Sequence, residues 1–187
     1  DITDQLGGLQ IAYDSINNNK GNAIIRILAG NHDTYFDQWS EYYELFGSST
    51  YFFVVKTPTQ SDLFIALETA SGTLGKLQKK WLEDILKEKR AQHRHCFVLT
   101  HTNFFDTELS QFPSGNFPLE ETAFLTNIFD RYNVNLVITG HDHSYDYSEL
   151  DGVRYLTLED IQDLDKKPSY FAINVQANEI TFEKEAL

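Results

Sequence analysis

The sequence predicts an α/β fold, and three observations support this. Helical and strand-like segments alternate early in the chain, as they do in a sheet flanked by helices. Strand-like segments dominate the later part, where the last two are expected to form a hairpin through residues 176–178. The 187 residues, of which 41% are hydrophobic, fall in the size range of one compact domain. We find no internal repeat or linker and therefore predict a single domain over residues 1–187.

Helical spacing of apolar residues or helix-end signals mark four segments: residues 3–19, 39–46, 77–86 and 119–132. Thr3 or Asp4 is expected to cap the first helix, which ends before the turn at Lys20-Gly21. The second carries a stripe of aromatic residues, which is more typical of a core-facing helix than of a cofactor site. Each of the four segments is therefore predicted to be a helix.

Other runs have the pattern of strands. The run 23–29 is apolar on nearly every residue, which predicts a strand buried on both faces. Buried strands are also expected at 96–100 and 134–139. Further strands are expected at 50–57, 63–69, 153–158, 169–176 and 179–184.

Charge and composition exclude several classes of function. The formal net charge of -13 argues against nucleic acid as a partner, because phosphate-backbone binding depends on clustered Lys and Arg. No apolar run is long enough to span a bilayer, and Cys96, the only cysteine, cannot form an internal disulfide. The chain starts at Asp1 and contains no Met, so we expect further residues upstream, and any signal peptide would lie there. Location and oligomeric state are not indicated.

Three of the predicted buried strands end in side chains that can bind a metal. Asn31-His32 follows the first, His101 follows the second, and His141 with His143 follows the third. Ligands of open α/β sheets bind beyond the carboxyl ends of the strands, so these side chains are expected to converge. Imidazole, amide and carboxylate donors without a thiolate suit Mn, Fe, Zn or a similar ion.

The motifs Gly30-Asn31-His32-Asp33 and Gly140-His141-Asp142-His143, with His101 between them, resemble those of the calcineurin-like metallophosphoesterases in type, order and context. Asp1 matches the end of the Gly-Asp motif that the family places before its Asn-His. The resemblance implies two packed mixed β-sheets flanked by helices, a metallophosphoesterase-like sandwich, with the first strand or strands and their Asp-x-His motif missing from this chain. Thr102-Asn103 departs from the family, where many relatives carry a nearby Pro.

The resemblance also implies two divalent metal ions. One would be held by Asp1, Asn31, His101 and His141. The other would share Asp1 and take His143, with its remaining protein ligands in the missing Asp-x-His motif. The identity of the metals, Mn, Fe, Zn or similar, stays open.

The expected activity is hydrolysis of a phosphomonoester or phosphodiester, with a small phosphate ester as the substrate. Two divalent ions about 3.5–4 Å apart lower the pKa of a bridging water and bind phosphoryl oxygens. His32, which is not a ligand in the family pattern, is expected to protonate the leaving oxygen, with Asp33 orienting it and favouring its protonated form. We expect residues 1–187 alone to hydrolyse such a substrate weakly or not at all.

Several alternatives remain. A nucleotide or pyrophosphate hydrolase would use the same residues, and a non-catalytic module would keep the fold and one metal. His93 and His95 lie in a basic stretch and are predicted to be surface residues. Phe104, Phe105 and Tyr145 would line a substrate pocket or pack in the core, and the acidic run 159–165 is expected to be a solvated loop.

Overall fold

The computed structural model describes residues 1–3, 5–105, 117–159, 161 and 169–186. The helices are α1 (Gly8–Asn19), α2 (Trp39–Phe46), α3 (Gly75–Lys89) and α4 (Leu119–Arg131), with short 3-10 helices η1 (His32–Asp37) and η2 (Arg90–Gln92). The strands are β1 (Tyr51–Lys56), β2 (Ser61–Ala66), β3 (Cys96–Leu99), β4 (Leu136–Thr139), β5 (Asp146–Leu150), β6 (Val153–Thr157), β7 (Ser169–Val175) and β8 (Ile180–Ala186).

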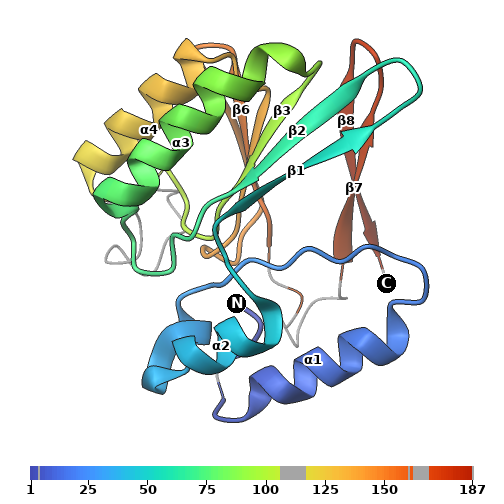
Figure 1. Ribbon diagram of the computed structural model, residues 1–187, viewed down its shortest axis with the longest axis vertical. Helices are drawn as coiled ribbons and strands as arrows, with labels where there is room; N and C mark the ends of the chain where they lie inside the picture. The colour runs from blue at the N-terminus through green and yellow to red at the C-terminus, as the bar shows by residue number, and fades with distance from the viewer. Residues whose placement is uncertain (4, 106–116, 160, 162–168, 187) are drawn as a thin grey trace.

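The strands form two sheets, and the predicted α/β class is confirmed. The larger sheet has the order β1-β2-β3-β4-β6-β5, in which the four inner strands run parallel and the two edge strands antiparallel to their neighbours. The antiparallel hairpin β7-β8 forms the second sheet. Helices α3 and α4 cover one face of the larger sheet, while the hairpin lies on the other side and α1 and α2 lie below (Figure 1).

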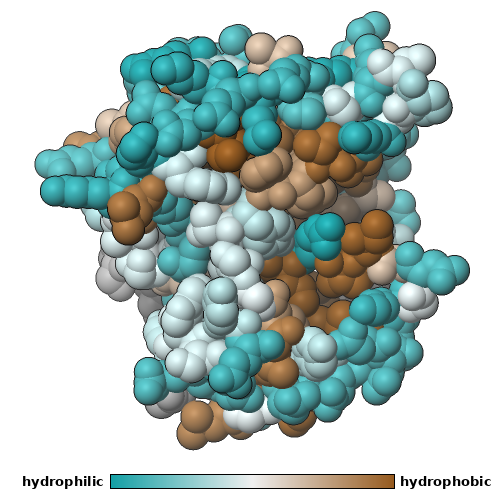
Figure 2. Space-filling model, in the orientation of Figure 1, coloured by the Kyte–Doolittle hydropathy of each residue, from teal (hydrophilic) through white to brown (hydrophobic). Residues whose placement is uncertain are grey.

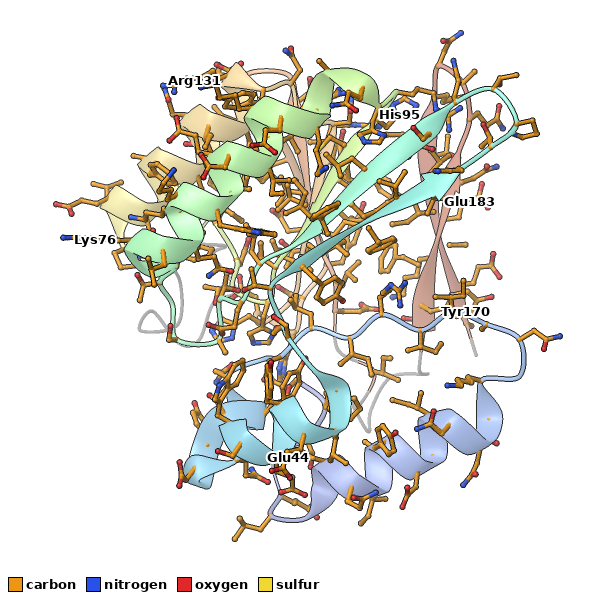
Figure 3. The ribbon with its side chains drawn as sticks, viewed as in Figure 1. Glu44, Lys76, His95, Arg131, Tyr170 and Glu183 are labelled. Carbon is orange, nitrogen blue, oxygen red and sulfur yellow. The ribbon has the colours of Figure 1, made fainter. Side chains whose placement is uncertain are left out.

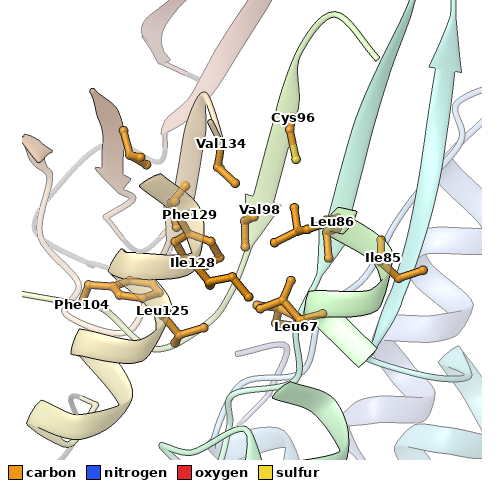
Figure 4. Close-up of a cluster of buried hydrophobic side chains, with 14 of the residues drawn as sticks. Leu67, Ile85, Leu86, Cys96, Val98, Phe104, Leu125, Ile128, Phe129 and Val134 are labelled. Carbon is orange, nitrogen blue, oxygen red and sulfur yellow. The ribbon is translucent and has the colours of Figure 1, made fainter. Parts of the chain in front are cut away.

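The main core lies between the larger sheet and the helices α3 and α4 (Figure 4). Leu86 of α3 and Phe129 of α4 meet Val98 of β3 in this core, where all three side chains are buried. Burying each such side chain stabilises the fold by about 1.5–3 kcal/mol relative to leaving it exposed. Charges suit the helix ends, since α4 has acidic residues in its first turn and Arg131 in its last.

A second core joins the two sheets. Phe97, Leu136 and Leu156 of the larger sheet pack against Ile180 of β8. The aromatic rings of Phe64 and Phe97 stack above one another with their centroids 4.4 Å apart. The packing of Ile180, Phe171 and Phe182 against this cluster holds the hairpin on the larger sheet.

The predicted strand over residues 23–29 is not formed, so this expectation was wrong. The segment is extended, yet it pairs with no strand among the described residues, and Ile24 and Ile25 are 80% and 42% exposed. Figure 2 shows apolar side chains gathered near β1 and this segment. Side chains hold its end instead: the Tyr51 hydroxyl donates to Ile27 O (2.8 Å), and Ala29 N donates to Ser49 Oγ (2.9 Å). Apolar content alone therefore did not produce a strand, because a strand also needs a paired neighbour.

Two further differences from the sequence predictions concern strand β5 and the start of helix α1. Strand β5 was not predicted, although Asp151-Gly152 (φ 51° and 78°) is the Asp-Gly pair typical of a two-residue hairpin turn. Helix α1 begins at Gly8 without a side-chain cap, later than the Thr3 or Asp4 cap predicts. Among the described residues, no helix has the length and apolar character needed to cross a membrane.

Candidate metal centre

Four oxygen and nitrogen donors from distant parts of the sequence meet beyond the carboxyl ends of β3 and β4. His101 Nε2 lies 2.8 Å from Asn31 Oδ1, 3.1 Å from His141 Nδ1 and 3.6 Å from Asp1 Oδ1. His141 Nδ1 is also 3.1 Å from Asn31 Oδ1. Ligands bound at about 2.1 Å around one tetrahedral first-row cation lie about 3.4 Å apart, so the spacing of these donors fits a single ion of this kind.

Strands β3 and β4 place His101 and His141 at the metal centre. His101 follows β3, His141 follows β4, and Gly140 N donates to His101 O (2.9 Å), which joins the two strand ends. His141 and His143 have φ values of 75° and 53°, in the left-handed region that non-glycine residues rarely occupy. Strain of this kind is typical of functional sites and persists only where surrounding contacts enforce it.

The Asn31 amide and the Asp1 carboxylate are also held in place. Asn31 Nδ2 donates to the Tyr35 hydroxyl (2.7 Å), which leaves Oδ1 facing the two histidines. Asp1 Oδ1 accepts a hydrogen bond from His32 N (2.9 Å). A Cβ atom at Gly30 would lie 2.1 Å from Asp1 Oδ1, so this close approach requires glycine. Tyr35 was not among the predicted site residues, because nothing in the motif marks it.

Asp33 has a different set of contacts from the one expected. Its fully buried carboxylate accepts hydrogen bonds from Ile2 N (2.7 Å), Thr3 N (2.9 Å) and Gly30 N (2.8 Å). It makes no hydrogen bond to the His32 ring within the described part of the chain. Asp33 therefore ties the first residues of the chain to the Asn31 turn, and its predicted action on His32 stays a prediction.

Burial keeps the two central histidines neutral. It lowers the pKa of His101 to about 2, and the nearby positive groups act in the same direction. Burial also lowers the pKa of His141. A neutral imidazole has a free lone pair, so both rings are ready to act as ligands near neutral pH.

Three of the four residues that supply these donors, Asp1, His101 and His141, line a pocket of about 460 Å³. Its lining combines predicted site residues with apolar side chains from both ends of the chain: Asp1, Ile2, Thr3, His32, His101, Gly140, His141, His143, Leu158, Glu159 and Ile161. His32 and His143, predicted as acid and ligand, thus line the same pocket as Asp1, His101 and His141. Glu159 accepts from Ser169 Oγ (2.6 Å) and pairs with Lys184, which joins the hairpin to the pocket wall.

The amide of Asn31 is essential to the fit of a cation. Within the described residues, no group of three or more His, Cys, Asp or Glu side chains is by itself arranged to hold a metal ion. Amide oxygens are also good ligands for hard and borderline cations, and the Asn31 oxygen lies beside His101 and His141. With the Asn31 oxygen included, four donors converge.

The chain matches the calcineurin-like phosphoesterases over residues 8–145, which is most of its length. It belongs to this family. Membership of this family implies that the protein uses divalent metal ions.

Three solved structures are similar to this chain, and the first of them shows the same fold. A dimetal phosphatase from Danio rerio is similar with a TM-score of 0.70 and 12% identity, covering 96% of this chain and 76% of that one. The Plasmodium protein GAP50, described as the anchor in the inner membrane complex, gives a TM-score of 0.48 and 15% identity over 71% of this chain. PhoD gives a TM-score of 0.45 and 13% identity over 83% of this chain. The chain spans 42% of GAP50 and 34% of PhoD, and no curated protein sequence matches it.

The other two histidines of the chain, His93 and His95, lie away from the metal centre. His95 was predicted to be a surface residue, but it is 8% exposed and its Nε2 lies 3.0 Å from Gln176 O. The prediction failed because the amino end of β3 packs against the turn of the β7-β8 hairpin. His93 is half-buried, with Nδ1 2.8 Å from Ser61 Oγ. Neither residue borders the pocket of the metal centre.

The predicted pocket aromatics divide between core and surface. Phe104 is 4% exposed and belongs to the main core, with Phe105 packed against it. Tyr145 is 49% exposed and stacks on Phe171, with ring centroids 5.6 Å apart. Of the acidic run 159–165, residues 160 and 162–165 lie outside the described residues.

Proposed function

We propose that this calcineurin-like phosphoesterase hydrolyses a small phosphomonoester or phosphodiester. The observation that carries the proposal is the convergence of Asp1 Oδ1, Asn31 Oδ1 and His141 Nδ1 within 3.6 Å of His101 Nε2, beside an open pocket. The family match supports the same reaction class. A negative overall charge is compatible with an anionic substrate where bound cations dominate the local field.

Asp1, Asn31, His101 and His141 would hold one divalent cation. Asp1 and His143 would contribute to a second, together with the Asp-x-His motif that the family places upstream. The description of the Danio rerio protein as a dimetal phosphatase supports two ions. When bound, such ions neutralise phosphoryl charge and make water a stronger acid near neutral pH.

The protein's own side chains divide the remaining work. His32 borders the pocket and is half-buried, so its ring can reach a bound substrate and give a proton to the leaving oxygen. Ile2, Leu158 and Ile161 supply an apolar wall, which strengthens electrostatic contacts with the phosphate by excluding water. Asp33 maintains the geometry by fixing the segment that carries Asp1.

The test is an assay of the full-length gene product with p-nitrophenyl phosphate and bis-p-nitrophenyl phosphate. The protein is first stripped with chelator and then supplied with Mn²⁺, Mg²⁺ or Zn²⁺. We expect hydrolysis that chelator abolishes and metal restores. If the protein hydrolysed neither ester with any of these ions, the proposed activity would be wrong.

The role of His32 is tested separately by comparing leaving groups. His32→Ala should slow an alkyl phosphate, which needs a proton on its leaving oxygen, by on the order of 10²–10⁴-fold. The same change should affect p-nitrophenyl phosphate much less, because p-nitrophenolate leaves without protonation. Equal effects on both substrates would contradict the acid role.

A non-catalytic metal-binding module is the second candidate. It is favoured by one observation: the converging donors account for a single cation within the described residues. This candidate predicts tight binding of one Mn²⁺ by calorimetry, with no hydrolysis of either ester. A stoichiometry of two, with turnover, would favour the enzyme.

A further inference from the structure

Asn103 lies directly behind the candidate metal centre, and its side-chain amide uses every hydrogen bond it can make. Its Nδ2 donates to Asp142 Oδ2 (2.5 Å) and to Phe105 O (2.8 Å). Its Oδ1 accepts from Phe104 N (2.7 Å) and from Thr157 Oγ1 (3.2 Å). The residue is 2% exposed. Two donors and two acceptor positions are thus all satisfied, which fixes the amide in one orientation.

The network around Asn103 joins three parallel strands at their carboxyl ends. Asn103 follows β3, and Thr157 ends β6. Thr139, the last residue of β4, donates its hydroxyl to Thr157 Oγ1 (3.0 Å). The remaining contact runs to Asp142, which lies between the two histidines of the His-x-His turn. Asn103 therefore connects this turn to the rigid sheet.

The turn needs such a connection. His141 and His143 both adopt left-handed backbone conformations, which are unfavourable for residues other than glycine. Asp142 N also donates to Gly140 O (3.0 Å), which closes a tight three-residue turn centred on His141. The Asp142 carboxylate, hydrogen-bonded to Asn103, lies between His141 and His143, which both line the pocket.

We propose that Asn103 and Asp142 form a positioning pair that holds His141 and His143 in the geometry needed to bind metal. This inference rests on the metal centre proposed above. Neither residue is assigned a direct contact with the ion or the substrate. Partners that orient ligands typically change metal affinity by about 10–100-fold when they are removed.

The test compares Asp142→Ala with Asp142→Asn. The alanine variant loses the acceptor for Asn103 Nδ2, whereas the asparagine variant keeps an acceptor oxygen of the same shape. Mn²⁺ affinity is measured by calorimetry, and the visible absorption spectrum of bound Co²⁺ reports ligand geometry. We expect Asp142→Ala to bind Mn²⁺ about 10–100-fold more weakly with an altered Co²⁺ spectrum, and Asp142→Asn to stay within about threefold of wild type.

A second pair of variants tests the bond from the other side. Asn103→Asp places two carboxylates against each other and should weaken Mn²⁺ binding. Adding Asp142→Asn to this variant restores a donor opposite the new carboxylate and should recover about tenfold of the loss, as expected for directly coupled residues. Thermal unfolding in chelator identifies any variant that fails to fold, in which case the Asp142 variants alone decide.

The outcomes separate the two proposals. Wild-type protein that binds no Mn²⁺ would overturn the metal centre and this inference with it. Tight binding by wild type together with equal affinity and an unchanged Co²⁺ spectrum in Asp142→Ala would overturn the positioning pair alone. Equal weakening in the alanine and asparagine variants would also overturn it, because the hydrogen bond would then not be the cause.

Discussion

Two His-x-His pairs with the same sequence pattern lie in opposite regions of the larger sheet. His141 and His143 follow β4 and border the pocket of the metal centre. His93 and His95 precede β3, and Figure 3 labels His95 at the end of the sheet away from α1 and α2. Their ring nitrogens contact Ser61 and a backbone carbonyl oxygen, so they help to close that end of the fold.

The difference shows that strand direction, more than residue type, decides where a metal site can form. All four inner strands run parallel, so their carboxyl ends share one edge, where His101, His141 and Asn31 meet. Residues before β3 instead reach the opposite edge, where Arg94 and Asp62 form a bidentate pair (2.9 and 2.6 Å). The candidate metal ligands therefore lie at the carboxyl ends of the parallel strands, and contacts that stabilise the fold lie at their amino ends.

The largest expected effect separates the two histidine pairs directly. His141→Ala removes a converging donor and should weaken Mn²⁺ binding by on the order of 100-fold or more, since losing even an outer partner of a ligand costs about 10–100-fold. His93→Ala, the matched control, should leave the Mn²⁺ affinity unchanged. Calorimetry on both variants checks the comparison, and equal losses would show that the two edges are not distinct.

The next effect concerns stability at the opposite edge. Asp62→Asn removes the buried carboxylate that pairs with half-buried Arg94 and should lower the free energy of unfolding, because the guanidinium loses its bidentate partner. Mn²⁺ affinity should not change. Asp84→Asn, which breaks the exposed pair with Lys80, is the control and should lower the free energy of unfolding much less. Urea denaturation measures both, and a large change in metal binding by Asp62→Asn would contradict the separation.

A smaller effect is the pH dependence of the metal-free protein. Burial lowers the pKa of His101 from 6.5 to about 2, so the unfolded state binds a proton below pH 6.5 that the folded state does not. Stability is therefore lost as the pH falls, by up to about 1.4 kcal/mol per pH unit between pH 6 and pH 4. Denaturation in chelator should show a shallower slope for His101→Gln. An identical slope would mean that His101 is protonated in the folded protein.

The smallest effect sharpens the description of the metal edge. Tyr35→Phe removes the hydroxyl that accepts from Asn31 Nδ2, so the amide is free to rotate and its oxygen is less often aimed at the ion. We expect about tenfold weaker Mn²⁺ binding with little change in unfolding temperature. Tyr43→Phe, at a side chain that is 57% exposed, is the control. Unchanged affinity in Tyr35→Phe would show that the amide is held by other contacts.

The sequence predicted much of the fold because its signals were local. Apolar spacing placed α2, α3 and α4, and unbroken apolar runs placed β3 and β4. The same kind of apolar run gave a wrong prediction over residues 23–29. A strand needs a hydrogen-bonding neighbour, and in the described part of the chain no strand pairs with this segment. Strand β5 escaped prediction although its Asp-Gly turn was visible in the sequence.

By itself the sequence determined the types of donor and their order: a carboxylate, an amide and three imidazoles, most of them placed just after apolar runs. Only the tertiary structure decided that Asp33 anchors backbone amides, that Tyr35 turns the Asn31 amide, and that Asn103 grips the turn between His141 and His143. The physical reason is that a hydrogen bond depends on distances of about 3 Å and on direction, which residues far apart in sequence acquire only once the chain has packed.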